Sequence, residues 1–378
     1  MIPQANPGAG YQALKPQIDA AVARALGSGW YVLGAEGRAF ESEFAHWLGT
    51  PRAVGCGNGT DALALTLRAM GIGPGKAVAT VSHTAVATVA AIEMAGATPV
   101  LIDIDKLHYT MDPAELAEVL AHPPAGLPPI AAIMPVHIYG QPVDLLPILA
   151  LGKKYGIPVI EDCSQAHGAT LGGQKVGTFS EASCFSLYPT KNLGALGDGG
   201  VMATGDAALA DEIAALRQYG WKTHYISEAA GVNSRLDELQ AAILRVKLEH
   251  LDANNARRQA IAARYDAAVA GGAWAAPARR ADATHVFHQY VVRVADRAGV
   301  QAALRAKGVA TGVHYPVPVH LQSAYAGRIA MGPAGCAVTA KAAEEVMSFP
   351  MFPELTDVQV GTVCDMVAEI SQRLPLHA

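Results

Sequence analysis

The sequence predicts an α/β fold with a mostly parallel sheet between helices, followed by a smaller α+β domain. Two observations support this prediction. Over the first two-thirds of the 378 residues, short apolar runs alternate with segments of helical periodicity. After Asn233 this alternation gives way to one long Ala-, Arg- and Leu-rich helical segment, residues 235–270. We therefore expect a large domain over residues 1–245 and a small domain over residues 246–378.

Helix and strand signals alternate through the first domain. A helix is expected from Thr60 to Met70, because Leu63, Leu67 and Met70 share one face. Residues 112–115 (DPAE) are typical of a capping box, with proline at the first helical position. The expected elements that follow Met70 are a strand over 98–103, a helix over 112–120, a strand over 130–136, a helix over 144–155 closed by Gly156, and a strand over 157–160.

The C-terminal part shows a shorter alternation. We expect a strand over 287–294, a helix over 296–307 and a strand over 309–315. In the larger parallel sheet, ligands are expected at the carboxyl ends of the strands. Functional residues are therefore sought directly after the apolar runs of the first domain.

Charge and composition narrow the class of protein. A net charge of -5 and a pI near 6.2 argue against a nucleic-acid or membrane-surface partner. The N-terminus lacks a basic and then apolar leader, and the longest apolar run (85–92) is too short to span a bilayer. Five scattered cysteines without C-x-x-C spacing fit reduced thiols in a cytoplasmic protein and indicate no metal site. A charged fraction of 16% fits surface hidden in a subunit interface, or simply an Ala-rich composition.

The first chemical motif is an acid at a strand end. The apolar run before Asp162 would deliver this carboxylate to the edge of the sheet where a ligand lies. A buried carboxylate needs a cationic partner, and the protonated pyridine nitrogen of pyridoxal 5′-phosphate (PLP) is one. A helix N-cap or a structural ion pair is the alternative interpretation.

The second motif is a lysine held between turns. Lys191 follows Pro189 and precedes a glycine-rich segment (residues 194–200), so its backbone is constrained and its amine partly desolvated. Such an amine is partly neutral and can condense with an aldehyde. An ordinary surface lysine is the alternative. Because Asp162 lies roughly thirty residues upstream, about one strand–helix–strand unit, the two side chains can reach opposite ends of one planar cofactor.

The third motif is the glycine-rich turn of residues 55–63 (GCGNGTDAL). Glycines with Thr60 at a helix start expose backbone N–H groups to an anion, whereas a plain helix cap is the equal alternative. The turn lacks the spacing of a dinucleotide site and the lysine of a P-loop, so a compact phosphate monoester is expected. Ser186 can add a hydroxyl to this site.

In this order, the three motifs resemble the DegT/DnrJ/EryC1/StrS family of sugar aminotransferases. The family shares the aspartate-aminotransferase fold (fold type I), which implies a seven-stranded sheet in the large domain. The similarity runs over nearly the whole chain, from residues 28–34 (SGWYVLG) to residues 316–322 (PVPVHLQ). Its most specific segments are residues 161–168 (EDCSQAHG), 188–194 (YPTKNLG) and 231–242 (GVNSRLDELQAA).

The resemblance implies a role for each matching residue. Lys191 would bond PLP and then shuttle the proton, and Asp162 would pair with the ring nitrogen. A homodimer with shared active sites is implied, because Asn233 would reach the phosphate of the neighbouring subunit. The remaining PLP contacts implied are Gln165 to the phenolic oxygen, and Gly59, Thr60 and Ser186 to the phosphate.

One position departs from the family pattern. Many relatives place an aromatic ring on the pyridine face where this chain has Ala85. His83 is the only ring nearby, so we expect it to stack on the cofactor. A buried histidine satisfied by the backbone is the alternative.

The resemblance also implies the substrates, an amino-acid donor (L-glutamate) and a nucleotide-linked keto-sugar. Residues 30–34 and 136–142 resemble the branch that aminates C3 of dTDP-3-keto-6-deoxyhexoses, with the C4-aminating branch as its rival. A sugar dehydratase is less favoured, because its family members carry histidine at the Lys191 position, and a non-catalytic regulator should have lost parts of the site. The expected sugar contacts are Tyr31, Tyr188, His314 and His320, for each of which packing in a loop is the alternative.

Overall fold

The computed structural model describes residues 1–373, and its centre is a seven-stranded sheet in the order β3-β2-β4-β5-β8-β9-β1. Two hydrogen-bonded ladders meet through parallel bridges that join Ile133 to Val159 and Val136 to Asp162. β9 pairs antiparallel with both of its neighbours, β8 and β1, and all other neighbouring strands of the seven are parallel. The short β14 extends the sheet beside β3. The strands are β1 (Arg52–Cys56), β2 (Ala77–Val81), β3 (Thr98–Ile102), β4 (Ile130–Ile133), β5 (Ile160–Asp162), β8 (Ala182–Ser186), β9 (Gly200–Thr204) and β14 (Ala330–Met331).

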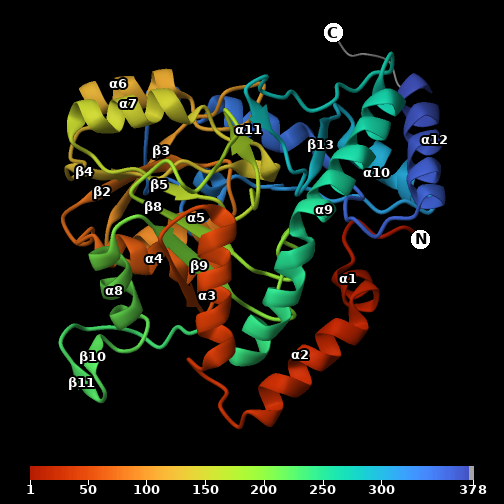
Figure 1. Ribbon diagram of the computed structural model, residues 1–378. Coiled ribbons are helices and arrows are strands. Elements are labelled where there is room, and N and C mark those ends of the chain that lie inside the picture. Colours follow the sequence, from red (N-terminus) through yellow and green to blue (C-terminus); the bar gives the residue numbers. More distant parts are fainter. Residues whose placement is uncertain (374–378) are drawn as a thin grey trace.

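Helices cover both faces of this sheet (Figure 1). Alternate residues of a strand point to opposite faces, and in β9 Met202 enters one core while Val201 and Ala203 enter the other. The first core contains α4 (Gly59–Ala69), α5 (Val86–Met94) and α8 (Ala207–Leu216), and the second contains α3 (Ala35–Leu48), α6 (Pro113–Ala121), α7 (Leu145–Tyr155) and the start of α9 (Glu238–Val269). The predicted α/β fold with a mostly parallel sheet is confirmed.

The small C-terminal part has its own core, built around the aromatic residues Tyr265, Tyr290 and Phe349. The helix α9 joins the two parts and crosses Figure 1 diagonally. The predicted division after residue 245 falls inside α9, and it stays a prediction. The other elements of this part are β13 (Tyr290–Arg293), paired antiparallel with β15 (Val346–Phe349), and the helices α10 (Arg297–Ala306), α11 (Ala337–Glu345) and α12 (Asp357–Arg373).

The remaining elements are short or peripheral. At the N-terminus, α1 (Pro7–Ala13) and α2 (Lys15–Gly27) lead back to the large domain beside α9 (Figure 1). A hairpin of β10 (Trp221–Thr223) and β11 (Ile226–Ser227) projects from the body beyond α8. A small three-stranded sheet consists of β6 (Thr170–Leu171), β7 (Gln174–Lys175) and β12 (Ala283–Thr284). Two 3₁₀ turns are also present, η1 (Ile138–Gly140) and η2 (Val319–Leu321). Within residues 1–373, no helix is both long and apolar enough to cross a membrane.

Two local predictions were wrong. Asp112 caps α6 by accepting a hydrogen bond from the backbone N–H of Ala114, but Glu115 does not complete a capping box. Its carboxylate instead accepts from the backbone N–H groups of Asp103 and Ala334, so it joins α6 to a distant loop. The strand expected over 309–315 forms only isolated bridges at Val309 and Gly312, because Val309 buries its side chain beside the N-terminal segment without a continuous ladder.

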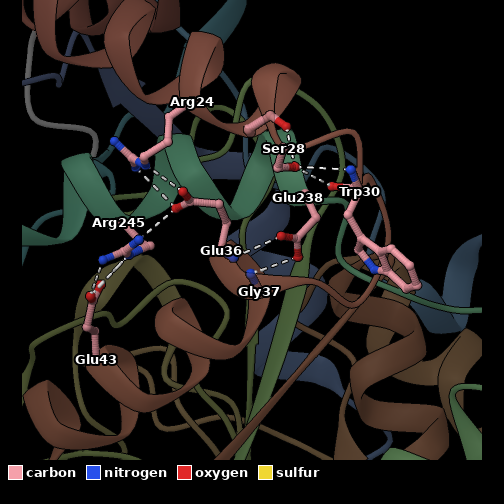
Figure 2. A network of polar contacts seen from close by, with 9 residues as sticks. Arg24, Ser28, Trp30, Glu36, Gly37, Glu43, Glu238 and Arg245 are labelled. Atoms are coloured by element: carbon pink, nitrogen blue, oxygen red, sulfur yellow. Dashed lines mark hydrogen bonds and ion pairs between the residues drawn. The ribbon is translucent and has the colours of Figure 1, made fainter.

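Glu238, the first residue of α9, secures the entry to α3 (Figure 2). Its carboxylate is 2% exposed and accepts hydrogen bonds of 2.8 Å from three backbone N–H groups, those of Gly34, Glu36 and Gly37. A Cβ at Gly34 would lie 2.5 Å from a Glu238 oxygen, so this position requires glycine. The same region carries ion pairs that link α2, α3 and α9, namely Arg24–Glu36, Arg245–Glu36 and Arg245–Glu43.

Candidate active site

A cavity of about 510 Å³ opens where the parallel strands end. Its wall includes Val136 after β4, Asp162 at the end of β5 and Ser186 at the end of β8. This is the edge at which α/β sheets bind ligands. Of the residues expected to form a site, seven line the cavity: Gly59, Thr60, Asp162, Gln165, Ser186, Tyr188 and Lys191.

One part of the cavity wall carries an acid without a cation. The Asp162 carboxylate is 3% exposed and accepts hydrogen bonds from Thr88 Oγ1 at 2.9 Å and from the backbone N–H of Ser164 at 3.1 Å. Both donors are neutral, and among residues 1–373 no lysine, arginine or histidine forms an ion pair with this carboxylate. A buried carboxylate of this kind favours a cationic group of a ligand in the cavity.

Another part is formed by the N-terminus of α4. Asn58 caps this helix by accepting from the backbone N–H of Asp61 at 2.9 Å. In the described part of the chain, the backbone N–H groups of Gly59 and Thr60 have no protein acceptor, which leaves them free for an anion. A Cβ on Gly59 would lie 2.6 Å from the Ser186 Cβ, so only glycine allows β8 to approach the helix this closely. Together these groups fit a compact phosphate.

Lys191 lies in the loop 187–199, between β8 and β9. Its backbone N–H donates to the carbonyl of Tyr188 at 2.8 Å, and the neighbouring Asn192 side chain donates to Asn255 Oδ1 and to the Val286 carbonyl. Burial lowers the pKa of the Lys191 amine to about 8, and the negative charge of Asp162 opposes this shift. At neutral pH a useful fraction of this amine is therefore unprotonated and nucleophilic.

Gln165 is fixed from two sides. Its Oε1 accepts from the backbone N–H of Tyr139 at 2.7 Å, and its Nε2 donates to the Tyr315 hydroxyl at 3.1 Å. Tyr139 is buried and has a φ of 62°, a conformation that non-glycine residues rarely adopt. The second hydrogen of the Gln165 amide nitrogen remains available to an acceptor in the cavity.

His83 does not line the cavity as expected. Its ring is 2% exposed and lies beside Tyr109 and Tyr139, with Nε2 2.7 Å from the Tyr139 hydroxyl. Thr84 and Ala85 line the cavity instead. The backbone after β2 directs the His83 side chain into the core. Its contacts match the alternative of a buried histidine, except that its hydrogen-bond partner is the Tyr139 side chain and not the backbone.

Four other expected residues also lie outside the cavity lining. His314 Nδ1 is 2.9 Å from Ser348 Oγ, and His320 Nδ1 is 2.7 Å from Ser82 Oγ, so both rings have protein partners. Tyr31 is 51% exposed. Asn233 is also exposed, and its backbone forms an isolated antiparallel bridge with Gln218.

Several lining residues were missed by the sequence analysis. Thr88, which donates to Asp162, is the most informative of these. The pair Thr84 and Thr88, spaced i, i+4 at a helix start after an apolar strand, was the available signal, and their hydroxyls are 2.8 Å apart.

A buried group of potential metal ligands, which sequence spacing did not suggest, lies beside β5: His137, Glu161 and Cys163. His137 Nδ1 accepts from the backbone N–H of Val143, so its Nε2 carries the proton and donates to Glu161 at 3.1 Å. Glu161 also accepts from the backbone N–H groups of Gly177 and Phe179 and from a serine hydroxyl. These hydrogen bonds give the group a structural role in anchoring β5.

Comparison with known proteins identifies the family. Residues 12–368 match the model of the DegT/DnrJ/EryC1/StrS aminotransferase family. A dTDP-3-amino-3,4,6-trideoxy-alpha-D-glucose transaminase of Streptomyces venezuelae is 43% identical over 97% of this chain and 95% of its own length. A UDP-N-acetyl-3-dehydro-alpha-D-glucosamine 3-aminotransferase of Acidithiobacillus ferrooxidans is 41% identical, with 97% of each chain covered.

Among solved structures, the crystal structure of S. venezuelae DesV in complex with a ketimine intermediate superimposes with a TM-score of 0.94. It is 42% identical to this protein, and 99% of each chain is covered. The Lys191 amine, the unpaired Asp162 carboxylate and the anion-binding turn at Gly59 together fit PLP. The chain belongs to the DegT/DnrJ/EryC1/StrS family and is a PLP-dependent aminotransferase of fold type I.

Proposed function

We propose that this enzyme transfers the amino group of L-glutamate to C3 of a dTDP-linked 3-keto-6-deoxyhexose in the cytoplasm. One observation supports this chemistry: three groups line the same cavity. They are the Lys191 amine with its lowered pKa, the Asp162 carboxylate without a cationic partner, and the free backbone N–H groups at the start of α4. The two relatives named above, both of which act at an amino group on C3 of a nucleotide-linked sugar, support C3 rather than C4.

Different residues of the cavity would bind different parts of the cofactor. Asp162 would accept a hydrogen bond from the protonated ring nitrogen and so keep that nitrogen charged, because its two protein donors are neutral and leave its negative charge unpaired. The Gln165 amide would donate to the phenolic oxygen. The phosphate would bind to the N–H groups of Gly59 and Thr60 and to the Ser186 hydroxyl. We assign no stacking role to His83, because its ring faces Tyr109 and Tyr139.

PLP, when bound, supplies an electron sink that stabilises negative charge at the α-carbon of the amino acid. Lys191 performs the proton chemistry. Its amine would hold the cofactor at the aldehyde carbon in the resting enzyme. Once displaced by the donor, the amine would move a proton from the donor α-carbon to the aldehyde carbon that it had held, and it would move a proton in the opposite direction when the keto-sugar enters. A pKa near 8 places this base close to the working pH, which makes proton transfer efficient in both directions.

We also infer a homodimer with shared active sites. Asn233 is exposed in this subunit, and it would reach the phosphate bound in the neighbouring one. Four large apolar or aromatic side chains of the segments 30–31 and 225–226 are also uncovered: Trp30 is 64% exposed, Tyr31 51%, Tyr225 77% and Ile226 57%. Such a surface is typical of a protein interface. Tyr188 is 52% exposed at the cavity and is a suitable sugar contact, whereas His314 and His320 would need a rearrangement to serve as one.

The test is product analysis with a panel of nucleotide-linked 3-keto- and 4-keto-sugars, each incubated with the enzyme, PLP and L-glutamate. We expect an amino sugar whose new C–N bond is located at C3 by NMR, and no product from the Lys191→Ala variant. Amination at C4 would refute the regiochemistry. Borohydride reduction followed by peptide mass spectrometry should label Lys191, and labelling of any other lysine would refute its role.

A further inference from the structure

A second cavity, of about 60 Å³, borders Lys191 outside the site described above. It lies between the segment 5–14, the lysine loop, α9 and the segment 351–354. Its volume is too small for a nucleotide or a sugar ring. It is large enough for a carboxylate group or a few water molecules.

Two cations without acidic partners line this cavity. Arg258 is 4% exposed, and its Nη1 donates to two backbone carbonyls, those of Phe287 at 3.1 Å and Met351 at 2.9 Å. Its Nε has no hydrogen-bond partner. The Lys247 amine donates to the Gly194 carbonyl at 2.7 Å. Within residues 1–373, neither side chain forms an ion pair.

Burial acts on both cations in the same direction. It lowers the pKa of Arg258 to about 10 and that of Lys247 to about 8. Glu354, also on the cavity wall, opposes both shifts but lies too far away for an ion pair. With both cations charged, the three groups carry a net charge of +1. A buried charge without a counter-ion is unfavourable, so the cavity favours a ligand with one negative charge.

We propose that this cavity binds a carboxylate group of the amino-acid donor, which places the donor beside Lys191. The assignment rests on the proposed aminotransferase function and names the group that recognises the donor rather than the sugar. The Arg258 guanidinium and the Lys247 amine, which both line the cavity, supply charge and hydrogen-bond donors to the carboxylate. Because Lys191 lines both cavities, a donor held here lies next to the cofactor site.

The test is the affinity of the PLP-loaded enzyme for succinate, a dicarboxylate without an amine, measured by isothermal titration calorimetry. Lys247→Met should weaken binding by about tenfold or more, because a charge-assisted hydrogen bond is lost. Lys175→Met is the matched control. The Lys175 amine also donates to a backbone carbonyl, that of Trp47, and burial also lowers its pKa, but it lies outside the cavity. Glu354→Gln should tighten binding, since it removes the negative charge.

Three results would overturn the assignment: no succinate binding to the natural protein, an unchanged affinity in both Lys247→Met and Glu354→Gln, or equal displacement of succinate by chloride or inorganic phosphate. The last would assign the cavity to small inorganic anions. Binding requires no turnover, so the two proposals fail separately. A protein that binds succinate but aminates no keto-sugar would refute the proposed function alone.

Discussion

Glu238→Gln tests how the entry to α3 is held. In the natural protein Oε1 accepts from the N–H groups of Gly34 and Gly37, and Oε2 accepts from Glu36. A glutamine keeps one oxygen but turns an amide N–H₂ group toward at least one backbone donor. The lost charge-assisted hydrogen bond contributes roughly 1.5–3 kcal/mol. The other two become neutral hydrogen bonds, and each loses about 1 kcal/mol of stabilisation. We expect the free energy of unfolding to fall by about 4 kcal/mol.

Urea denaturation followed by circular dichroism provides the assay, with the midpoint shift converted through the m-value. Glu43→Gln is the control from the same network, because the Glu43 side chain is 42% exposed and pairs with a partly exposed Arg245. Its ion pair should contribute no more than about 1 kcal/mol. If the two variants lose the same stability, the three buried hydrogen bonds to Glu238 do not hold the α3 entry as argued.

The remaining predictions concern the cofactor site. Asp162→Asn should lower the rate of amino transfer by orders of magnitude while leaving the fold intact, and a rate near that of the natural enzyme would contradict its role at the ring nitrogen. Gly59→Ala should weaken PLP binding, measured by absorbance titration, because the new Cβ meets Ser186. The rate at which the cofactor-free protein condenses with PLP should rise with pH and level off above about 8, because the neutral amine reacts and burial lowers the Lys191 pKa to that value. A rise that continues toward 10.5 would indicate an ordinary lysine. Tyr315→Phe removes the hydroxyl that accepts from Gln165 and should shift the pH dependence of the cofactor absorbance, whereas a purely structural role would change stability alone.

The sequence predicted the parts of the site that local patterns control. Asp162 follows an apolar strand, and Lys191 lies between turns, so both positions could be inferred from residues close by in the chain. The structure brings both to one cavity at the strand ends. The strands β3 and β4 could be predicted in the same way, because each is a short apolar run delimited by neighbouring turns and helices.

Contacts between distant residues could not be predicted in this way. Glu115 was assigned to its own helix cap, but its partners include Ala334, 219 residues away. His83 was chosen for stacking as the only ring in its segment, whereas the direction of a side chain just after a strand depends on its tertiary neighbours. The Arg258 and Lys247 cavity likewise combines α9 with the lysine loop and with the segments 5–14 and 351–354, which are more than 330 residues apart.

The antiparallel direction of β9 has a consequence for catalysis. Because β8 and β9 pair directly, with Ser186 opposite Gly200, both ends of the loop that carries Lys191 are tied to one rung of the same hairpin. The sheet thus fixes both ends of this loop, and the hydrogen bonds of Asn192 to Asn255 and Val286 fix its middle. Two anchored ends and a braced middle hold the reacting nitrogen at a constant distance from the strand ends that carry Asp162 and Ser186, so the resting site is already arranged for the cofactor before any substrate enters.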